Sequence, residues 1–350
     1  MSGGVDSSAA AAILVRENNN VVGVTMKIWD GQGKDPRPGG CCSIDDTDDA
    51  RRVCENLGIP HYTLNAKEAF KADVVDYFVS QYYAGMTPNP CIPCNQALKF
   101  GYLFQQGEKF GATKVATGHY ARIEAFMGRK VIARAVDEEK DQSYYLFSID
   151  PSRLDNIEFP LGSYTKEMTR KLASELSLPV AQKPESQEIC FVPDNDYKSF
   201  IRRASGAGQA GEGDIVDSSG AVIGRHTGYT DYTVGQRKGL GIAAPAPMYV
   251  LSVDPGSNKV TAGFKEDLYS NNLLAGGANW FIPPEDFSKL DLTSKIRSRG
   301  KDSQAKVGVL DDGRFTVEFK DPQLAITPGQ AVVIYHQDYV IGGGWIEKSL

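Results

Sequence analysis

Short apolar runs alternate with amphipathic helical periods over roughly the first 150 residues of the chain. Residues 21–26 are predicted to form a buried strand, and further strands are expected at 61–65 and 113–120. Residues 45–60 and 165–179 place apolar side chains at helical spacing, and each segment ends at a proline. Strands that alternate with helices in this way predict an α/β domain with a parallel sheet.

The pattern changes after about residue 204, where glycine becomes frequent and helical periods give way to alternation. Residues 249–264 and 305–319 are each predicted to form a hairpin, the first turning at Pro-Gly and the second at Asp-Gly. Two more strands, 331–335 and 340–347, follow and predict a small C-terminal β-barrel. The expected domains are 1–204, a small central domain at 205–265, and the barrel at 266–350.

The amino-acid composition limits the classes of protein to which the chain can belong. The 350 residues are 41% apolar and 23% charged, which is enough to bury one or two substantial cores. Six cysteines, with Cys91 and Cys94 as a close pair, fit a reducing compartment better than a disulfide scaffold. No stretch has the length of a membrane span, and no secretory or transit segment opens the chain. We therefore expect a cytoplasmic protein without a membrane partner.

The net charge of −6, from 38 basic and 44 acidic side chains, means that any nucleic-acid surface must be a local patch. Residues 295–301 offer such a patch, because Lys295, Arg297, Arg299 and Lys301 occur there without an acidic residue. A solvated strand face would carry the same pattern. Charge alone leaves both interpretations open.

The chain opens with MSGGVDSS, a glycine turn that leads into a predicted helix. Such a turn presents backbone N–H groups to one point and favours phosphate, although an ordinary helix cap has the same form. It is not a Walker loop, because the GxxxxGK[ST] spacing and its lysine are missing. It is similar to the SGGxDS loop of the ATP pyrophosphatases, which implies adenylation of a substrate with release of pyrophosphate. Such a loop normally follows a strand, so we expect the sheet to lack its first strand, from truncation or from an internal start.

The cysteines help to decide which of the possible reactions such a loop serves. Cys91 and Cys94 lie in NPCIPCN, where prolines stiffen a loop that enters a helix near Asn95, and Cys190 lies in ESQEICFV. A thiol near a helix N-terminus has more of the reactive thiolate form. A CxxC pair also occurs as half of a zinc site. Cys54 is expected in the core, and the roles of Cys41 and Cys42 stay open.

Seven motifs, in order along nearly the whole chain, resemble those of the bacterial tRNA-specific 2-thiouridylases. They are MSGGVDSS, TPNPCIPCNQALKFG, ATGHYAR, KDQSYYL, ESQEICFV, TVGQRKGLGI and TPGQAVVIY. The resemblance implies ATP-dependent 2-thiolation of the wobble uridine in the tRNAs for Lys, Glu and Gln, with ATP and Mg²⁺. It also implies a persulfide or sulfide donor as a partner, and a monomer, free or bound to tRNA.

By this resemblance, Cys94 is the nucleophile and Cys190 carries the persulfide. Cys91 stands where many family members have the aspartate proposed as general acid/base, so either another group moves that proton or the mechanism differs. Cys91, Cys94 and Cys190 equally match three ligands of a four-iron, four-sulfur cluster that would carry sulfide. The spacing does not separate the two routes.

The resemblance also implies binding residues for ATP and for tRNA. Those for ATP are Gly3, Gly4, Val5, Asp6, Ser7, Met26 and Gly118. Those for tRNA are Asn89, Pro90, Cys91, His119, Lys140, Asp141, Gln142, Arg297, Ser298 and Gln330.

Two other functions would use parts of the same sequence. A ligase of the argininosuccinate or GMP synthetase type shares the phosphate loop but needs no cysteine. A non-catalytic RNA-binding module with a structural metal would bind tRNA without consuming ATP.

Overall fold

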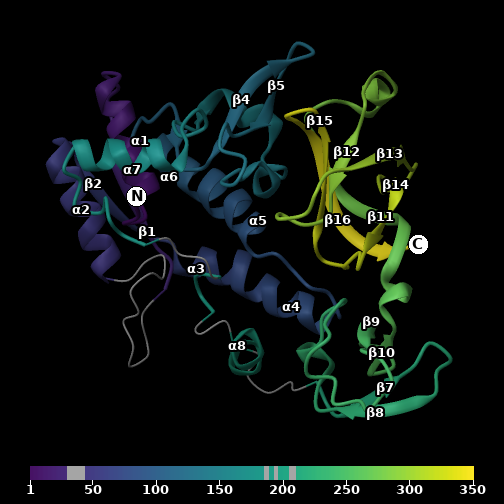
Figure 1. Ribbon diagram of the computed structural model, residues 1–350. Coiled ribbons are helices and arrows are strands. Elements are labelled where there is room, and N and C mark those ends of the chain that lie inside the picture. Colours follow the sequence, from purple (N-terminus) through teal and green to yellow (C-terminus); the bar gives the residue numbers. More distant parts are fainter. Residues whose placement is uncertain (30–43, 185–188, 193–195, 205–209) are drawn as a thin grey trace. The chain divides into compact units, whose positions relative to one another are not determined.

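The computed structural model describes residues 1–29, 44–184, 189–192, 196–204 and 210–350 (Figure 1). The chain divides into two compact units, each described here by itself. The first comprises Met1–Val74, Cys91–Asn195 and Asp338–Val340, and the second comprises Val75–Pro90, Asp196–Gln337 and Ile341–Leu350. The domain boundaries expected at 204 and 265 stay predictions.

The first unit combines helices with short pairs of strands (Figure 1). Its α-helices are α1 (Val5–Arg16), α2 (Ile44–Leu57), α3 (Lys67–Phe70), α5 (Cys91–Pro93), α6 (Leu103–Lys109) and α7 (Lys166–Glu175). Its other helical segments are the π-helical η2 (Cys94–Tyr102) and the 3₁₀ turns η3 (Ser143–Leu146) and η4 (Pro151–Asn156), while the π-helical η1 (Lys71–Asp76) continues α3. The helices predicted within 45–60 and 165–179 are confirmed as α2 and α7.

The strands of this unit form two parallel pairs and one hairpin. They are β1 (Gly23–Lys27) with β2 (His61–Asn65), β3 (Val115–Ala116) with β6 (Ile157–Glu158), and the antiparallel β4 (Ala121–Phe126) and β5 (Arg129–Arg134). The strands predicted at 21–26 and 61–65 are confirmed as β1 and β2, the first two residues later than expected at its start. The strand predicted at 113–120 is wrong beyond β3, because residues 117–120 leave the sheet for contacts described below.

Helix α1 lies at the centre of the first unit. Its alanines are buried around most of the helix, and they join two apolar clusters. One cluster holds Ala12 with Val53 of α2, and the other holds Ala9 with Tyr120 and with Leu172 of α7. A helix that is apolar on most sides must be enclosed by other elements. Packing on both sides therefore fixes the N-terminus of α1, where the glycine turn lies.

The second unit contains a four-stranded sheet and a closed barrel. The sheet has the order β8-β7-β10-β9, from β7 (Gly213–Val216), β8 (Val222–His226), β9 (Tyr249–Asp254) and β10 (Lys259–Gly263). The barrel strands are β11 (Tyr269–Trp280), β12 (Thr293–Lys295), β13 (Ser303–Val309), β14 (Phe315–Leu324), β15 (Ala331–His336) and β16 (Tyr339–Ser349). Their order is β11-β14-β13-β12-β15-β16, and pairing of β11 with β16 closes the barrel, which confirms the prediction.

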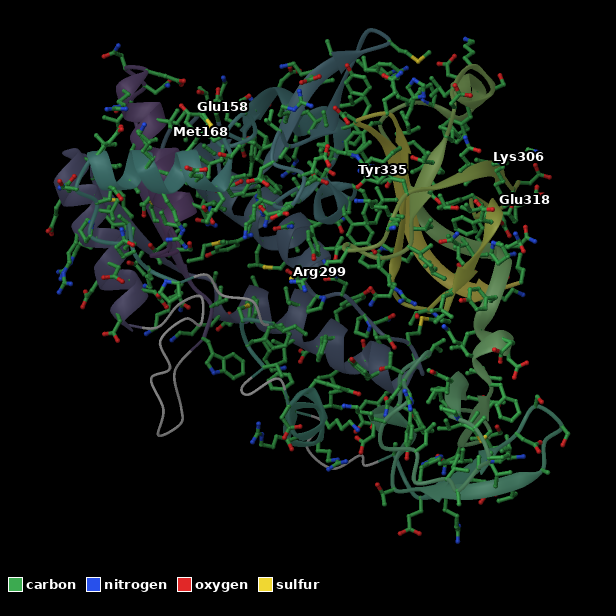
Figure 2. The ribbon with its side chains drawn as sticks, in the orientation of Figure 1. Glu158, Met168, Arg299, Lys306, Glu318 and Tyr335 are labelled. Atoms are coloured by element: carbon green, nitrogen blue, oxygen red, sulfur yellow. The ribbon has the colours of Figure 1, made fainter. Side chains whose placement is uncertain are left out.

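Register within the barrel follows the alternation of its strands. Lys306 on β13 stands opposite Glu318 on β14, and the two side chains lie together in Figure 2. Tyr335 on β15 is fully buried, as are most residues of that strand. The unit also contains α4 (Tyr77–Tyr83) and α8 (Tyr197–Ala204), whose rings Tyr82 and Tyr197 stack with centroids 5.1 Å apart. Among the described helices, none is long and apolar enough to cross a bilayer.

Candidate active site

The glycine turn at the start of the chain is shaped by close backbone contacts. Gly3 has φ +70°, and a Cβ there would lie 2.3 Å from the Asp46 carbonyl oxygen at the start of α2. Gly4 is the N-cap of α1, so the N–H groups of Val5, Asp6 and Ser7 have no partner within the helix. The five residues predicted to hold phosphate therefore form one turn of chain at a helix N-terminus, where an anion is favoured.

The Asp6 carboxylate in this turn has two partners from distant parts of the sequence. Lys166 Nζ donates to both of its oxygens, at 2.7 and 2.9 Å, and the Tyr120 hydroxyl donates to Oδ1 at 2.9 Å. The Tyr120 hydroxyl also lies 2.9 Å from Thr169 Oγ1 on α7. Lys166 is the first residue of α7 and its side chain is only 12% exposed. A cation is thus held beside the loop although the loop has no basic residue of its own.

Residues 117–120 bring the loop and the cysteine-bearing helix into one site. A Cβ on Gly118 would lie 2.6 Å from the Asp6 carbonyl carbon and 2.7 Å from the Ser7 nitrogen, so only glycine fits there. The next residue, His119, contacts Lys99 on η2, and Tyr120 reaches back to Asp6. This short segment thus contacts the phosphate loop and, through Lys99, the helical segment that begins at Cys94.

His119 is a buried, neutral imidazole. Lys99 Nζ can only donate, so His119 Nε2 accepts at 3.2 Å and Nδ1–H donates to Thr117 Oγ1 at 2.7 Å. Burial, and then the charge of Lys99, hold the pKa of His119 well below its usual value. The rings of Phe100 and Phe159 enclose it, with centroids 6.1 and 5.9 Å away. The predicted contact of His119 with tRNA stays a prediction.

Cys91 and Cys94 begin two consecutive helical segments, so the helical stretch starts earlier than the position near Asn95 that the sequence predicted. Cys91 is the first residue of α5 and is exposed, while Cys94 is the first residue of η2 and is half-buried. Buried Ile92 and Asn95 anchor the turn between them, and Asn95 Nδ2 donates to the Tyr145 carbonyl at 3.2 Å. A π-helix of this length is rare and is frequently found at functional sites.

Cys190 is exposed beside two anchored neighbours. Phe191 packs edge-on against Phe70 at 5.5 Å, and Val192 is buried. Cys54 is buried as predicted, and its burial raises the pKa of its thiol. Cys41 and Cys42 lie outside the described residues.

Metal ligation was one alternative for these cysteines. Within the described part of the chain, no three His, Cys, Asp or Glu side chains lie together as a metal ion requires. A cluster held by Cys91, Cys94 and Cys190 stays a prediction. We derive no step through such a cluster.

The KDQ motif packs against the same site. Asp141 Oδ1 accepts from the backbone nitrogens of Ala135 and Ser143, at 3.1 and 3.2 Å. Gln142 exchanges two hydrogen bonds with the backbone of Tyr120, at 2.8 and 3.0 Å. The Gln142 side chain thus holds the backbone of Tyr120, the Asp141 side chain holds that of Ala135 and Ser143, and Lys140 is half-exposed. Met26 lies on β1 and is half-buried, and its predicted place at the adenine is not tested by these contacts.

In the second unit, the TPGQ turn holds the segment that leads to Asn89 and Pro90. Gln330 Nε2 donates to the Thr87 carbonyl at 2.7 Å, and the Thr87 nitrogen donates to the Pro328 carbonyl at 2.8 Å. A Cβ on Gly329, which has φ +88°, would lie 2.8 Å from the Thr87 nitrogen. Sequence reasoning missed this pairing of segments 243 residues apart, and no local pattern signals it.

The structure divides the basic stretch 295–301 into two kinds of residue. Lys295 is 14% exposed beside Asp302 and the Tyr335 ring, and Arg297 Nη2 donates to the carbonyls of Leu324 and Ala325 at 2.9 and 2.6 Å. Arg299 (labelled in Figure 2) and Lys301 are exposed, and Ser298 is half-buried. A cavity of ≈ 340 Å³ beside Arg297 is lined by Thr87, Thr233, Tyr249, Lys265 and Gln330, among others.

Comparison with known proteins covers the whole chain. The model of the tRNA methyl transferase HUP domain matches residues 1–194, that of the tRNA methyl transferase PRC-barrel domain matches 198–263, and that of the aminomethyltransferase beta-barrel domain matches 270–346. The chain is 48% identical over 356 residues to the tRNA-specific 2-thiouridylase MnmA of Geobacter metallireducens, covering 100% of this chain and 96% of that protein. It is 46% identical over 353 residues to that of Heliobacterium modesticaldum, covering 100% and 92%.

Proposed function

The chain belongs to the family of tRNA-specific 2-thiouridylases, and we propose that it is an ATP-dependent sulfurtransferase acting on the wobble uridine of the tRNAs for Lys, Glu and Gln. One observation carries this proposal. Residues 117–120 contact the phosphate loop through Gly118 and Tyr120 and the cysteine-bearing helix through His119. A site that activates with ATP and then transfers sulfur needs these two parts together.

The first step is activation of the uracil carbonyl. Its oxygen attacks the α-phosphorus of ATP, the bond to the bridging oxygen breaks, and pyrophosphate leaves with the electron pair. The N–H groups of Val5, Asp6 and Ser7 are suited to hold the phosphates. The Asp6 carboxylate is a ligand type that Mg²⁺ accepts, and the metal that accompanies ATP would neutralise phosphate charge. The adenylate is a far better leaving group than oxide.

The second step is sulfur transfer. The terminal sulfur of a persulfide on Cys190 attacks the activated carbon, and AMP leaves. The Cys94 thiolate then attacks the inner sulfur of Cys190, which releases sulfur to the uridine as the thiocarbonyl and leaves a Cys94–Cys190 disulfide. A dithiol reductant resets the two thiols, and a persulfide donor such as a cysteine desulfurase or a relay protein reloads Cys190.

Proton transfer in these steps has no aspartate at position 91. Cys91 is exposed on α5 near the start of the same helical stretch as Cys94. It would act as a base only as a thiolate, so we assign no proton transfer to it. The enzyme is proposed to work as a cytoplasmic monomer, with tRNA and the sulfur donor as its partners.

Nucleoside mass spectrometry tests the proposal. Purified enzyme, ATP, Mg²⁺, a persulfide source and unmodified tRNA should give 2-thiouridine at the wobble position. Cys94→Ser and Cys190→Ser should each abolish it, whereas Cys54→Ala, a matched change at a buried thiol, should keep turnover per folded molecule. Full activity of both serine variants would contradict the cysteine mechanism and favour a ligase. Activity that requires iron reconstitution would favour the cluster route.

A further inference from the structure

The phosphate loop lacks the cation that other phosphate loops carry. Residues 1–8 contain no lysine or arginine, whereas a Walker loop places a lysine on the β- and γ-phosphates. A departing pyrophosphate concentrates negative charge, so a loop of N–H groups alone leaves much of that charge unbalanced. Lys166, 160 residues away in sequence, supplies a cation through its contact with Asp6.

Lys166 is held in place at both ends of its side chain. Its backbone nitrogen donates to Asp137 Oδ2 at 2.8 Å, and Thr165, the N-cap of α7, accepts from the Met168 nitrogen at 3.2 Å. At the other end, Nζ donates to both Asp6 oxygens and lies 5.8 Å from the centre of the Tyr120 ring. The ammonium group is therefore pre-positioned at the mouth of the loop, where little reorganisation is needed to meet a phosphate.

Asp6 holds the Lys166 ammonium group beside the phosphate loop. A carboxylate in the first turn of α1 suits the helix, yet it would repel a polyphosphate that approaches the same N–H groups. The Lys166 charge cancels this repulsion. Because the pair is 12% and 32% exposed, solvent screens it only in part.

We propose that Lys166 binds the β- and γ-phosphates of ATP and stabilises the pyrophosphate as it leaves, which rests on the proposed function. As the bond between the α-phosphorus and the bridging oxygen breaks, the electron pair passes to pyrophosphate. Lys166 stays protonated throughout, exchanges Asp6 oxygens for phosphate oxygens, and transfers no proton. A lysine is suited to this task because its ammonium is a compact charge on a flexible stem.

A purely indirect role of Lys166 would produce part of the same loss of triphosphate binding. Lys166 could act only by neutralising Asp6, without touching ATP. A double-mutant cycle separates the two roles. If the lysine only neutralises Asp6, the double variant binds the triphosphate as Asp6→Asn alone does. If it binds phosphate directly, the double variant is weaker than Asp6→Asn alone.

The experiment measures binding of α,β-methylene-ATP and of AMP by calorimetry to the full-length enzyme, with Lys166→Met, Asp6→Asn and the double variant. We expect Lys166→Met to weaken binding of the triphosphate analogue about 10- to 100-fold and to leave AMP affinity unchanged, because AMP has no β- or γ-phosphate. Lys166→Arg should recover part of the loss. Lys171→Met, at an exposed lysine on the same helix, is the matched control and should bind as the parent enzyme does.

Three results would overturn the inference: equal losses for AMP and the triphosphate, triphosphate binding in the double variant equal to that of Asp6→Asn, or unchanged binding in Lys166→Met. The double variant also covers the case in which Lys166→Met fails to fold, since it leaves no unpaired carboxylate. The parent enzyme is measured first. If the parent makes no 2-thiouridine, the proposed function is wrong. If the parent is active and the Lys166 variants bind the triphosphate analogue as the parent does, only the role given to Lys166 is wrong.

Discussion

Replacing Gly118 with alanine should separate the phosphate loop from the rest of the site. The added Cβ would lie 2.6, 2.7 and 2.9 Å from the Asp6 carbonyl carbon, the Ser7 nitrogen and the Asp6 oxygen. All three atoms are backbone, so no side chain can rotate away. Ordinary contact begins at 3.4 Å, and the loop must therefore move by about 0.8 Å. Overpacking of this kind costs about 1–3 kcal/mol of the free energy of unfolding.

Function should fall further than stability. Catalysis is sensitive to displacements of about 1 Å, so we expect kcat/KM for thiolation to fall by about 10- to 100-fold. Gly107→Ala is the matched control in the same unit, because its Cβ would meet only the Ala112 Cβ at an ordinary 3.6 Å. As a helical glycine, it should gain about 0.5–1 kcal/mol in unfolding free energy and keep its activity.

Urea unfolding and steady-state thiolation assays measure the two effects. The close approach of Gly118 to the loop is refuted if Gly118→Ala keeps both its unfolding free energy and its kcat/KM within error of the parent. A loss of stability without any loss of ATP-dependent rate would also contradict the reasoning, since it would place the strain away from the loop.

Three further predictions concern single residues. Thr165→Ala removes the N-cap of α7 and should cost about 1 kcal/mol in urea unfolding, while raising the KM for ATP through Lys166. Burial keeps His119 neutral in the folded protein, so below pH 6.5 only the unfolded chain takes up its proton. Stability should therefore fall on account of this group as the pH is lowered through about 6.5, and His119→Gln should lose that part of the slope in denaturation curves. Arg297→Ala should lower the melting temperature, because it frees two carbonyls, whereas Arg299→Ala should weaken tRNA binding mainly at low salt in filter-binding assays.

The features of the fold that depend on local sequence patterns could be predicted. Apolar periodicity predicted α2, α7 and the barrel, because burial of one face leaves a regular trace in the chain. The cysteine loop was predicted to enter a helix because prolines limit its backbone, and α5 begins at Cys91 itself.

Pairings between distant segments could not be predicted in this way. The contact of Lys166 with Asp6 spans 160 residues, and that of Gln330 with Thr87 spans 243. A single polar contact has no period, and its partner is chosen by how whole elements pack. The strand expected at 113–120 failed for the same reason, since contacts of Gly118 and His119 outside the sheet outweigh their strand-like context.

The proposed sulfur transfer leaves Cys94 and Cys190 joined by a disulfide. Single turnover with persulfide-loaded enzyme, ATP and tRNA, without reductant, should be followed by peptide mass spectrometry under non-reducing conditions. A disulfide-linked pair of peptides carrying Cys94 and Cys190, equal in amount to the 2-thiouridine formed, is the expected result. Formation of 2-thiouridine with both thiols still free would contradict the mechanism.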